Sequence, residues 1–418
     1  MPSTVPALAP VAPEARLLQL DVLRGLALLG VLLVNLSMFS GSEWALDAHL
    51  PYPMGWGGSV LQILRGALLE SKAAALLAML FGAGLTIQAE ALVRRGERHL
   101  PFSLRRVGVL AGFGLAHSFL LWDGDILLDY ALISLLMLPV LKVGARRILW
   151  TIPLLWAAAG LIILPFAGRI SAASHLIEQT ARFNALGVEH YGSDSWLALL
   201  KYRAWEMVHI FGPVRLANRL PILLPFFVLG AYFWKKGFLS EPERHRAALR
   251  RMVWIFGLLG LAANLFPQEL VWSFSARFSL RPLRILVRAT YFFAKPGLTL
   301  GYAAGILLLL QHPFARRALG AFAPLGRMAL TQYLLQSFVC TWIFNGHGLG
   351  LYGKVPISHY LAGGLALYGL QMWSSRLWLA HFRMGPAEWL WRRLTYGSPQ
   401  AFRRGAPDPL RAPATTGL

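Results

Sequence analysis

Long apolar runs separated by short polar links dominate the pattern of hydrophobic and polar positions along the 418-residue chain. A helix needs about 20 apolar residues to cross the hydrocarbon core of a bilayer. Ten runs approach this length, and they cover residues 22–40, 71–92, 105–121, 125–142, 147–167, 220–235, 252–268, 296–311, 324–345 and 359–380. The pattern therefore predicts an all-α polytopic membrane protein with about ten transmembrane helices. A shorter apolar segment, 58–70, is expected to lie at the interface or to re-enter the membrane ahead of the second span.

The composition supports this fold class. Hydrophobic residues make up 56% of the chain and charged residues only 14%, and the mean hydropathy is +0.53. Soluble domains carry about 25% charged residues, so this balance is typical of a membrane protein. The net charge of +21 would suit a nucleic acid, but the basic residues punctuate the apolar runs instead of forming one patch. We therefore expect a lipid bilayer, and no nucleic acid, as a partner.

Lysine and arginine alternate between the links as the positive-inside rule requires for cytoplasmic and outer loops. The basic links are 93–104, 142–147, 235–251 and 312–317 together with the C-terminal tail, and the links with little or no Lys and Arg are 41–57, 122–125 and 345–358. Both termini are then expected in the cytoplasm. We predict one multi-pass domain over residues 19–398, with disordered ends at 1–18 and 399–418.

Two outer links fit the rule less well. The link 168–219 is long and mixed in charge, and the helical spacing of its apolar residues between Trp196 and Val208 predicts an amphipathic helix over the outer face. The link 269–295 leaves an eleventh span open as an alternative. It carries Arg277, Arg281, Arg284 and Arg288, whose spacing puts them on one helical face. Such a stripe suits contact with lipid phosphate, with an anionic substrate as the alternative.

The hairpin formed by the third and fourth runs carries the ionisable residues of most interest. Its turn, WDGD, contains Asp123 and Asp125, with His117 about one helical turn before it and Tyr130 shortly after it. Ionisable side chains at or inside a bilayer are costly and are functional candidates for that reason. A neutral histidine beside a carboxylate can accept a proton, because the carboxylate fixes the tautomer and raises the basicity. The structural alternative is a histidine bonded inside the bundle beside solvated turn residues.

The predicted topology brings further polar residues to the same outer half of the membrane. Asn35 lies in the outer half of the first run and Lys72 at the start of the second, although a lysine there can also snorkel to the headgroups. The predicted catalytic residues are His117 and Asp125, and the predicted pocket residues are Asn35, Lys72, Asp123, Tyr130, Gln336 and Arg24. Of these residues, the topology puts Asn35, Lys72, His117, Asp123 and Asp125 in the outer half of the membrane, where we expect an outward-facing polar pocket.

Two of these pocket residues have ordinary structural alternatives. Arg24 shares a helical face with Asn35 but lies one turn from Asp21, so it can form an interfacial ion pair. Gln336 belongs to a polar patch in the ninth run, and such patches either hold helices together or line a cavity. The chain contains no GxSxG, HExxH, P-loop or cysteine-cluster motif, so no metal site is predicted.

Several stretches resemble the YeiB-like family of bacterial inner-membrane proteins, which is defined by a domain of unknown function. They include LDVLRGLALLGVLLVN, LLAMLFGAGL and GLAHSFLLWDGDILLDYAL, with PLGRMALTQYLLQS and FRMGPAEWLWRRLTYG in a C-terminal hallmark region at about 230–397. The resemblance covers nearly the whole chain. It implies a multi-pass protein of the bacterial inner (plasma) membrane. One departure is the second run, which has LLAMLFG where the family usually has an LFS-LFG pattern.

The LDVLRG start and the span pattern are in turn similar to membrane acyltransferases of the acyltransferase-3 and heparan-glucosaminide acetyltransferase-like groups. That similarity implies acyl-CoA as a donor and a glycan, lipid or small-molecule acceptor. A histidine ends the equivalent first span in the acyltransferase-3 group. Asn35 stands there in this chain, so that role does not carry over and His117 with Asp125 is the available base.

Three function classes follow from these residues. In an acyltransferase, His117 would act as general base on an outward-facing acceptor, oriented by Asp125. In a transporter or exporter of a small molecule, the same polar residues would line a path and relay protons. Transporters usually show internal repeats, and the sequence has none that is convincing. A purely structural membrane protein is the third class.

Overall fold

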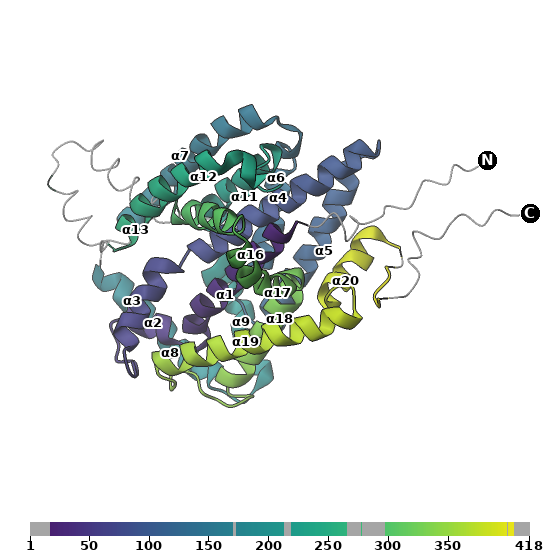
Figure 1. The fold of residues 1–418 in the computed structure, drawn as a ribbon. Coiled ribbons are helices and arrows are strands. Elements are labelled where there is room, and N and C mark those ends of the chain that lie inside the picture. Colours follow the sequence, from purple (N-terminus) through teal and green to yellow (C-terminus); the bar gives the residue numbers. More distant parts are fainter. Residues whose placement is uncertain are drawn as a thin grey trace, which may run out of the picture.

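The computed structural model describes residues 17–169, 173–212, 219–265, 277, 297–398 and 400–404. Apart from one isolated bridge between Phe382 and Arg403, every regular element in these ranges is helical (Figure 1). The all-α fold class is therefore confirmed. Most of the two predicted disordered ends lies outside the described residues, as does the link 269–295 except for Arg277.

The helices follow one another closely along the chain. The first half contains α1 (Leu18–Phe39), α2 (Ser42–Asp47), α3 (Gly58–Leu68), α4 (Lys72–Arg94), α5 (His99–Leu120), α6 (Leu127–Met137), α7 (Ala145–Arg169), α8 (Ala173–Tyr191) and α9 (Trp196–Glu206). The second half contains α11 (Leu220–Lys235), α12 (Arg246–Met252), α13 (Leu258–Leu265), an unlabelled helix (Gly297–Leu309), α16 (Pro313–Leu319), α17 (Ala323–Arg327), α18 (Ala329–Phe344), α19 (Ile357–His381) and α20 (Pro386–Tyr396). Short 3₁₀ or π segments occupy Val140–Lys142, Met207–Phe211, Pro242–His245, Val253–Gly257 and Gly320–Phe322.

Helices occupy all ten predicted runs, but they differ in length. Among the described residues, α1, the kinked Gly58–Arg94 helix and Pro242–Leu265 are each long and apolar enough to cross a membrane. A fourth crossing is possible where Gly297–Leu309 and Pro313–Arg327 meet at 118°. These apolar helices fit a helical membrane protein, whereas the number of ten spans and the orientation of the termini stay predictions.

Two predicted spans are shorter or more broken than their hydrophobic runs. The run 125–142 forms only the 11-residue helix α6 before a 3₁₀ turn. Pro139 explains the early end, because a proline lacks the backbone N–H that a helix interior needs. The run 324–345 divides into α17 and α18, since Met328 leaves the helical region with φ −111° and ψ 29°.

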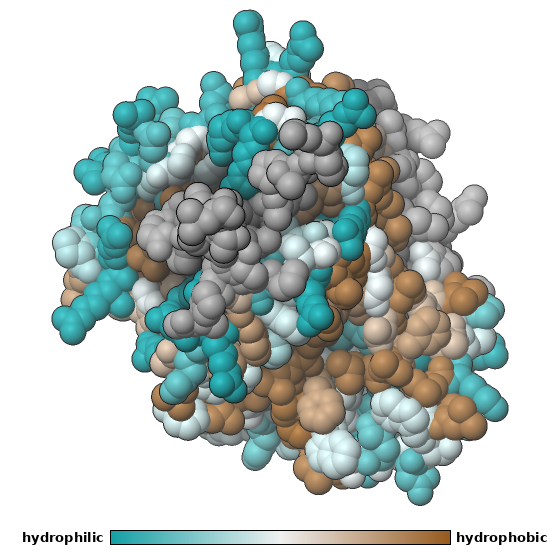
Figure 2. Space-filling view, turned by 90° about the vertical axis from the view of Figure 1, so that its right-hand side faces the viewer, coloured by the Kyte–Doolittle hydropathy of each residue, from teal (hydrophilic) through white to brown (hydrophobic). Residues whose placement is uncertain are grey.

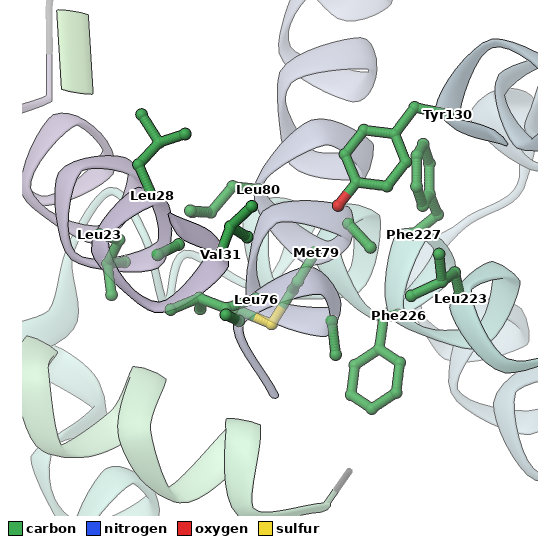
Figure 3. Packing of buried hydrophobic residues seen from close by; sticks show 14 of the residues in the cluster. Leu23, Leu28, Val31, Leu76, Met79, Leu80, Tyr130, Leu223, Phe226 and Phe227 are labelled. Atoms are coloured by element: carbon green, nitrogen blue, oxygen red, sulfur yellow. The ribbon is translucent and has the colours of Figure 1, made fainter. Parts of the chain in front are cut away.

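Helix α1 runs through the centre of the bundle, where it contacts α4, α17, α18 and α19 (Figure 1). Its buried leucines pack towards α4 in one continuous apolar cluster, in which Leu23 and Leu28 lie near Leu80 (Figure 3). The same cluster continues through Tyr130 of α6 and Phe227 of α11. The central helix therefore buries its side chains against helices from both halves of the chain.

The tightest crossing in this core joins α4 to α11. A β-carbon added to Gly82 would collide with the backbone carbonyl of Phe227, and one added to Gly230 would collide with that of Met79. Small residues allow such close approach between membrane helices, where dispersion contacts rather than exclusion of water hold helices together. The sequence alone does not identify Gly230 as the partner of Gly82.

A carboxylate from the end of the chain caps the start of α18. Glu388 of α20 accepts hydrogen bonds at its Oε1 from the backbone amides of Leu330, at 2.7 Å, and Thr331, at 3.1 Å. Its Oε2 accepts from Thr331 Oγ1 at 2.5 Å. The first amides of a helix have no partners within the helix, so this side chain satisfies donors that would otherwise be buried and unpaired. The GPAEW sequence therefore helps to fix α20 against α18.

The surface of the bundle agrees with a membrane location. Figure 2 shows apolar side chains over the middle and lower part of one face, with hydrophilic side chains at its upper and lower ends. Trp150, Trp254 and Trp373 are among the large apolar side chains that stay exposed. Exposed apolar area of this extent marks contact with a membrane or a partner.

Replacement of Gly230 by leucine is expected to destabilise the protein by about 1–3 kcal/mol or more, because the new side chain overpacks the α4–α11 crossing. Thermal unfolding of the detergent-purified protein measures the effect. Gly108→Leu is the matched control, since that glycine is exposed and a β-carbon there meets nothing within 4 Å. Equal unfolding temperatures for the two variants would contradict the close crossing.

Candidate functional site

The candidate site is built on the turn between α5 and α6. Helix α5 ends where the backbone amides of Leu121 and Trp122 both donate to the carbonyl of His117. The turn folds inwards, so Asp123 and Asp125 are buried rather than solvated. The alternative of two exposed turn aspartates is therefore wrong.

His117 and Asp125 form a buried pair. The Nδ1 atom of His117 lies 2.9 Å from Oδ1 of Asp125, and neither side chain has any solvent exposure. The second oxygen of Asp125 accepts a hydrogen bond of 2.6 Å from the backbone amide of Leu128, in the first turn of α6. One carboxylate therefore holds the imidazole and caps the following helix, which fixes the direction in which the imidazole points.

Neither nitrogen of the imidazole has a hydrogen bond of good geometry among the residues that the structure describes, although Nδ1 lies close to the carboxylate. The ring of Tyr333 in α18 lies against the imidazole, with centroids 5.0 Å apart, and its hydroxyl accepts a 3.3 Å hydrogen bond from the amide of Ile126. With Nδ1 2.9 Å from the carboxylate, Nε2 is the nitrogen that faces away from Asp125. Buried polar atoms are rarely left unpaired, so Nε2 is poised for a water or a substrate group.

An ion pair lies one helical turn beyond the dyad. Nη1 of Arg219 is 3.3 Å from Oδ2 of Asp129 and 3.5 Å from the carbonyl oxygen of Asp125. Asp129 has no solvent exposure. Neither residue was among the predicted site residues. Asp129 could have been found, because it is a second acidic residue in the first turn of α6, close in sequence to Asp125.

A second acidic group lies at the same turn. The hydroxyl of Tyr191 is 2.7 Å from Oδ1 of Asp123 and 2.7 Å from Oε2 of Glu206. A hydroxyl has one proton, so it can donate to one carboxyl only and must accept from the other. The three groups therefore hold an additional proton. Burial raises the pKa of Glu206 well above its ordinary value, and the nearby Asp123 carboxyl raises it further.

This acidic group borders a small enclosed space. The cavity has a volume of about 10 Å³, and Asp123, Tyr191, Glu206 and Asn345 contribute to its wall. That volume is close to the least that can hold one water molecule. The amide nitrogen of Asn345 has no partner in the described part of the chain, so a polar occupant would satisfy it. The site as folded is closed to anything larger.

Helices α8 and α9 supply the cover of this cavity. The predicted helix around Trp196–Val208 is present as α9, which contacts α5. Arg203 of α9 is almost completely buried, and its Nη1 donates to the carbonyl of Leu120 at 3.0 Å. The cover is thus hydrogen-bonded to the last turn of α5, the turn that also contains His117.

Two of the predicted pocket residues lie on helices other than those of the dyad. Lys72 is buried at the start of α4, where its Nζ donates to the carbonyl of Gly66 at 3.0 Å. Asn35 is half-buried on α1. The snorkelling alternative for Lys72 does not describe this buried side chain.

The remaining three predicted pocket residues form hydrogen bonds or ion pairs that hold the helices together or stabilise their ends. Tyr130 donates to the carbonyl of Ala74 at 2.7 Å and packs in the apolar core (Figure 3). Nε2 of Gln336 in α18 donates to Oε1 of Gln371 in α19 at 2.9 Å, which joins two helices. Arg24 pairs with Asp21 at 3.2 Å.

Comparison with known proteins places the chain in a family. The profile of the family described as "Protein of unknown function (DUF418)" matches residues 233–398. The chain is 33% identical over 409 residues to "Uncharacterized protein YxaH" of Bacillus subtilis (strain 168), which covers 93% of this chain and 96% of the relative. The chain belongs to this DUF418, YeiB-like family. No solved structure matches it significantly.

Two further relatives span similar lengths. "Uncharacterized protein YeiB" of Escherichia coli (strain K12) is 28% identical over 398 residues, or 90% of this chain and 95% of that protein. An "Uncharacterized 39.9 kDa protein in amylase 3'region" of Bacillus acidopullulyticus is 29% identical over 388 residues, or 93% of this chain and 96% of that protein. Membership of this family and the apolar helices together support a bacterial membrane protein.

Glu206→Gln is expected to change how stability depends on pH. The raised pKa means that the native state binds the proton more tightly than the unfolded state. The contribution of Glu206 is therefore largest below its ordinary pKa of 4.5 and is lost as the pH rises towards the native pKa. The E206Q protein keeps a neutral hydrogen-bonding group, so its unfolding temperature should gain on the wild type between about pH 5 and 8.

Thermal unfolding across this pH range tests the expectation. Glu178→Gln is the control, because Glu178 is an exposed acid on α8. A difference between E206Q and wild type that stays constant with pH would show that the acidic group holds no additional proton.

Proposed function

We propose that this protein is an acyltransferase embedded in the bacterial inner membrane. It would move an acyl group from a thioester such as acyl-CoA to a hydroxyl or amine of a glycan, lipid or small-molecule acceptor at the outer face. The observation that supports this function is the buried His117–Asp125 pair, in which Nδ1 faces the carboxylate and Nε2 has no partner among the described residues. A general base requires this combination of a held nitrogen and a free one.

The reaction follows from the two nitrogens of the imidazole. The acceptor oxygen or nitrogen attacks the thioester carbonyl while Nε2 of His117 takes its proton. The new bond from the acceptor to the carbonyl carbon forms, the carbon–sulfur bond breaks, and the proton returns from Nε2 to the thiolate. The Asp125 carboxyl group lies beside Nδ1 and stabilises the imidazolium that exists between the two proton transfers, at a site where little water screens the charges.

Substrates must reach Nε2 through a part of the protein that is closed. The nearby cavity is water-sized, and α9 is bonded over it through Arg203 and Glu206. We therefore propose that the α8–α9 cover moves aside when the acceptor binds. A site from which water is excluded has a chemical benefit, because water cannot then take the acyl group in place of the acceptor.

His117→Ala is expected to lower acyl transfer by about 10²–10⁴-fold, which is the usual contribution of a positioned general base. Asp125→Asn should give a comparable loss for a different reason. Its amide oxygen can still cap α6, but its NH₂ group would donate to Nδ1 and move the imidazole proton to Nε2. Release of free thiol from acetyl-CoA in proteoliposomes supplied with candidate acceptors measures the rate. Unchanged rates in both variants would overturn the proposal.

A control separates loss of chemistry from loss of fold. Ser118→Ala changes the residue next to His117, whose buried hydroxyl has no partner among the described residues. It should therefore keep both activity and unfolding temperature. The D125N protein should also unfold near the wild-type temperature, since its cap on Leu128 remains.

A proton-coupled transporter is the second candidate, and a specific observation favours it. Buried acidic groups occur at three successive positions: the Glu206–Asp123 group, the His117–Asp125 pair and Asp129 with Arg219. A series of this kind suits proton relay across the outer half of a membrane.

The transporter is tested in the same vesicles. Under this alternative, an imposed proton gradient should drive solute movement in wild-type vesicles, and Asp125→Asn should abolish it without any acyl product in either case. Vesicles with Glu178→Gln are the control. Solute movement that is indifferent to the gradient would exclude the alternative.

A further inference from the structure

A second, larger cavity lies apart from the dyad, between α2 and α3. It has a volume of about 430 Å³, and its wall includes Glu43 and Asp47 of α2 and Arg65 and Glu70 at the end of α3. This volume falls within the range of about 300–1,000 Å³ that is typical of small-molecule sites. In Figure 1 these two helices lie at the lower left, next to each other, so the cavity belongs to one end of the bundle.

The floor of the cavity is a closed network. The hydroxyl of Ser37 donates to Oε2 of Glu43 at 2.5 Å and accepts from Nη1 of Arg65 at 3.0 Å. Nη1 also lies 3.9 Å from Oε2 of Glu43. The positive charge of Arg65 therefore balances the carboxylate of Glu43. Two other acidic residues of the cavity wall, Asp47 and Glu70, lie outside this network.

Those walls are negative. Asp47 and Glu70 are exposed to the cavity side, and neither forms an ion pair or side-chain hydrogen bond within the part of the chain that the structure describes. Burial raises the pKa of Asp47 above its ordinary value, and the repulsion from Glu70 adds to that effect. A negative wall is unusual in a chain whose net charge is +21. A cation in the cavity would relieve this repulsion.

At the floor of the cavity, one N–H donor of Arg65 has no acceptor among the described residues. Arg65 has only 9% of its surface exposed, and its Nε has no hydrogen-bond partner among the described residues. A ligand that fills the cavity must therefore bring an oxygen to Arg65 as well as a positive charge to Asp47 and Glu70. A bare metal ion does not meet both needs. The described residues also contain no group of three His, Cys, Asp or Glu side chains arranged to hold a metal.

We propose that this cavity binds a ligand that carries an ammonium group beside an acidic oxygen, as in an aminoethyl phosphate. The ammonium group lies between Asp47 and Glu70, and an oxygen of the ligand accepts from Arg65. Such chemistry can come from a free molecule or from the headgroup of a membrane lipid. The site does not depend on the acyltransferase proposal.

The membrane is the nearer source of such a ligand. Ile63 contributes to the cavity wall with 66% of its surface exposed, and Val60, one helical turn earlier on α3, is 60% exposed. Trp56, just before α3, is 90% exposed. Exposed apolar side chains beside a charged cavity would contact acyl chains while the headgroup enters the cavity.

Titration calorimetry of the full-length protein in detergent with O-phosphoethanolamine tests the site. Wild type should bind it, and the double variant Asp47→Asn, Glu70→Gln should bind at least tenfold more weakly. Glycerol phosphate, which has no ammonium group, should not bind to either. Glu189→Gln, at an exposed position of α8, is the matched control and should leave binding unchanged.

Native mass spectrometry with equal phosphatidylethanolamine and phosphatidylglycerol distinguishes the two sources. Preferential retention of the ethanolamine lipid, lost in the double variant, assigns the site to a headgroup, whereas binding of the soluble phosphate alone assigns it to a free ligand. Ser59→Trp fills the cavity without changing a charge and should also abolish binding. The double variant should unfold no earlier than wild type, because it removes a repulsion.

The proposal is overturned if wild type binds neither ligand, or if the double variant and S59W bind both as tightly as wild type. A loss of equal size in Glu189→Gln would also overturn it, because the effect would then follow overall charge rather than the cavity.

Discussion

The requirement that polar groups inside an apolar bundle find partners within the protein governs this structure. In hydrocarbon an unpaired group costs several kcal/mol, so a polar side chain on a central helix must be bonded or must serve a purpose. Gln336 meets this requirement through Gln371, and Glu388 meets it for the amides that begin α18. The imidazole of His117 is one of several exceptions among the described residues, and it lies 2.9 Å from a buried carboxylate. That combination, more than the presence of a histidine, directs attention to the hairpin between α5 and α6.

The extent to which the fold could be predicted follows from what hydrophobicity measures. Apolar runs locate helices, and a helix is present in every predicted run. Hydrophobicity does not report helix breaks, so the early end of α6 and the division at Met328 were missed. It also does not say which helices touch. Gly82 was recognisable as a contact residue, but its partner Gly230 lies far along the chain and no local pattern connects them.

The candidate site could also be predicted from the sequence only in part. The pairing of His117 with Asp125 was predictable, because a tight turn forces residues on either side of it together. Glu206 and Tyr191 were not predictable, since they reach Asp123 from a long link with no fixed register. Lys72 and Asn35 were grouped with the dyad because the predicted topology gave them the same depth in the membrane. Residues at one depth on different helices can face different directions, so depth alone does not predict a shared pocket.

The central place of α1 has a consequence for how the protein is made. Synthesis produces α1 before any of the helices that surround it, and three of its neighbours, α17, α18 and α19, come from the last third of the chain. Tyr368 of α19, for example, donates to the carbonyl of Gly25 at 2.7 Å. The faces of α1 that these three helices cover must therefore stay uncovered until translation is almost complete, although α4 can pack against α1 much earlier. A chain whose synthesis stops early would lack the contacts that bury its first helix on these faces.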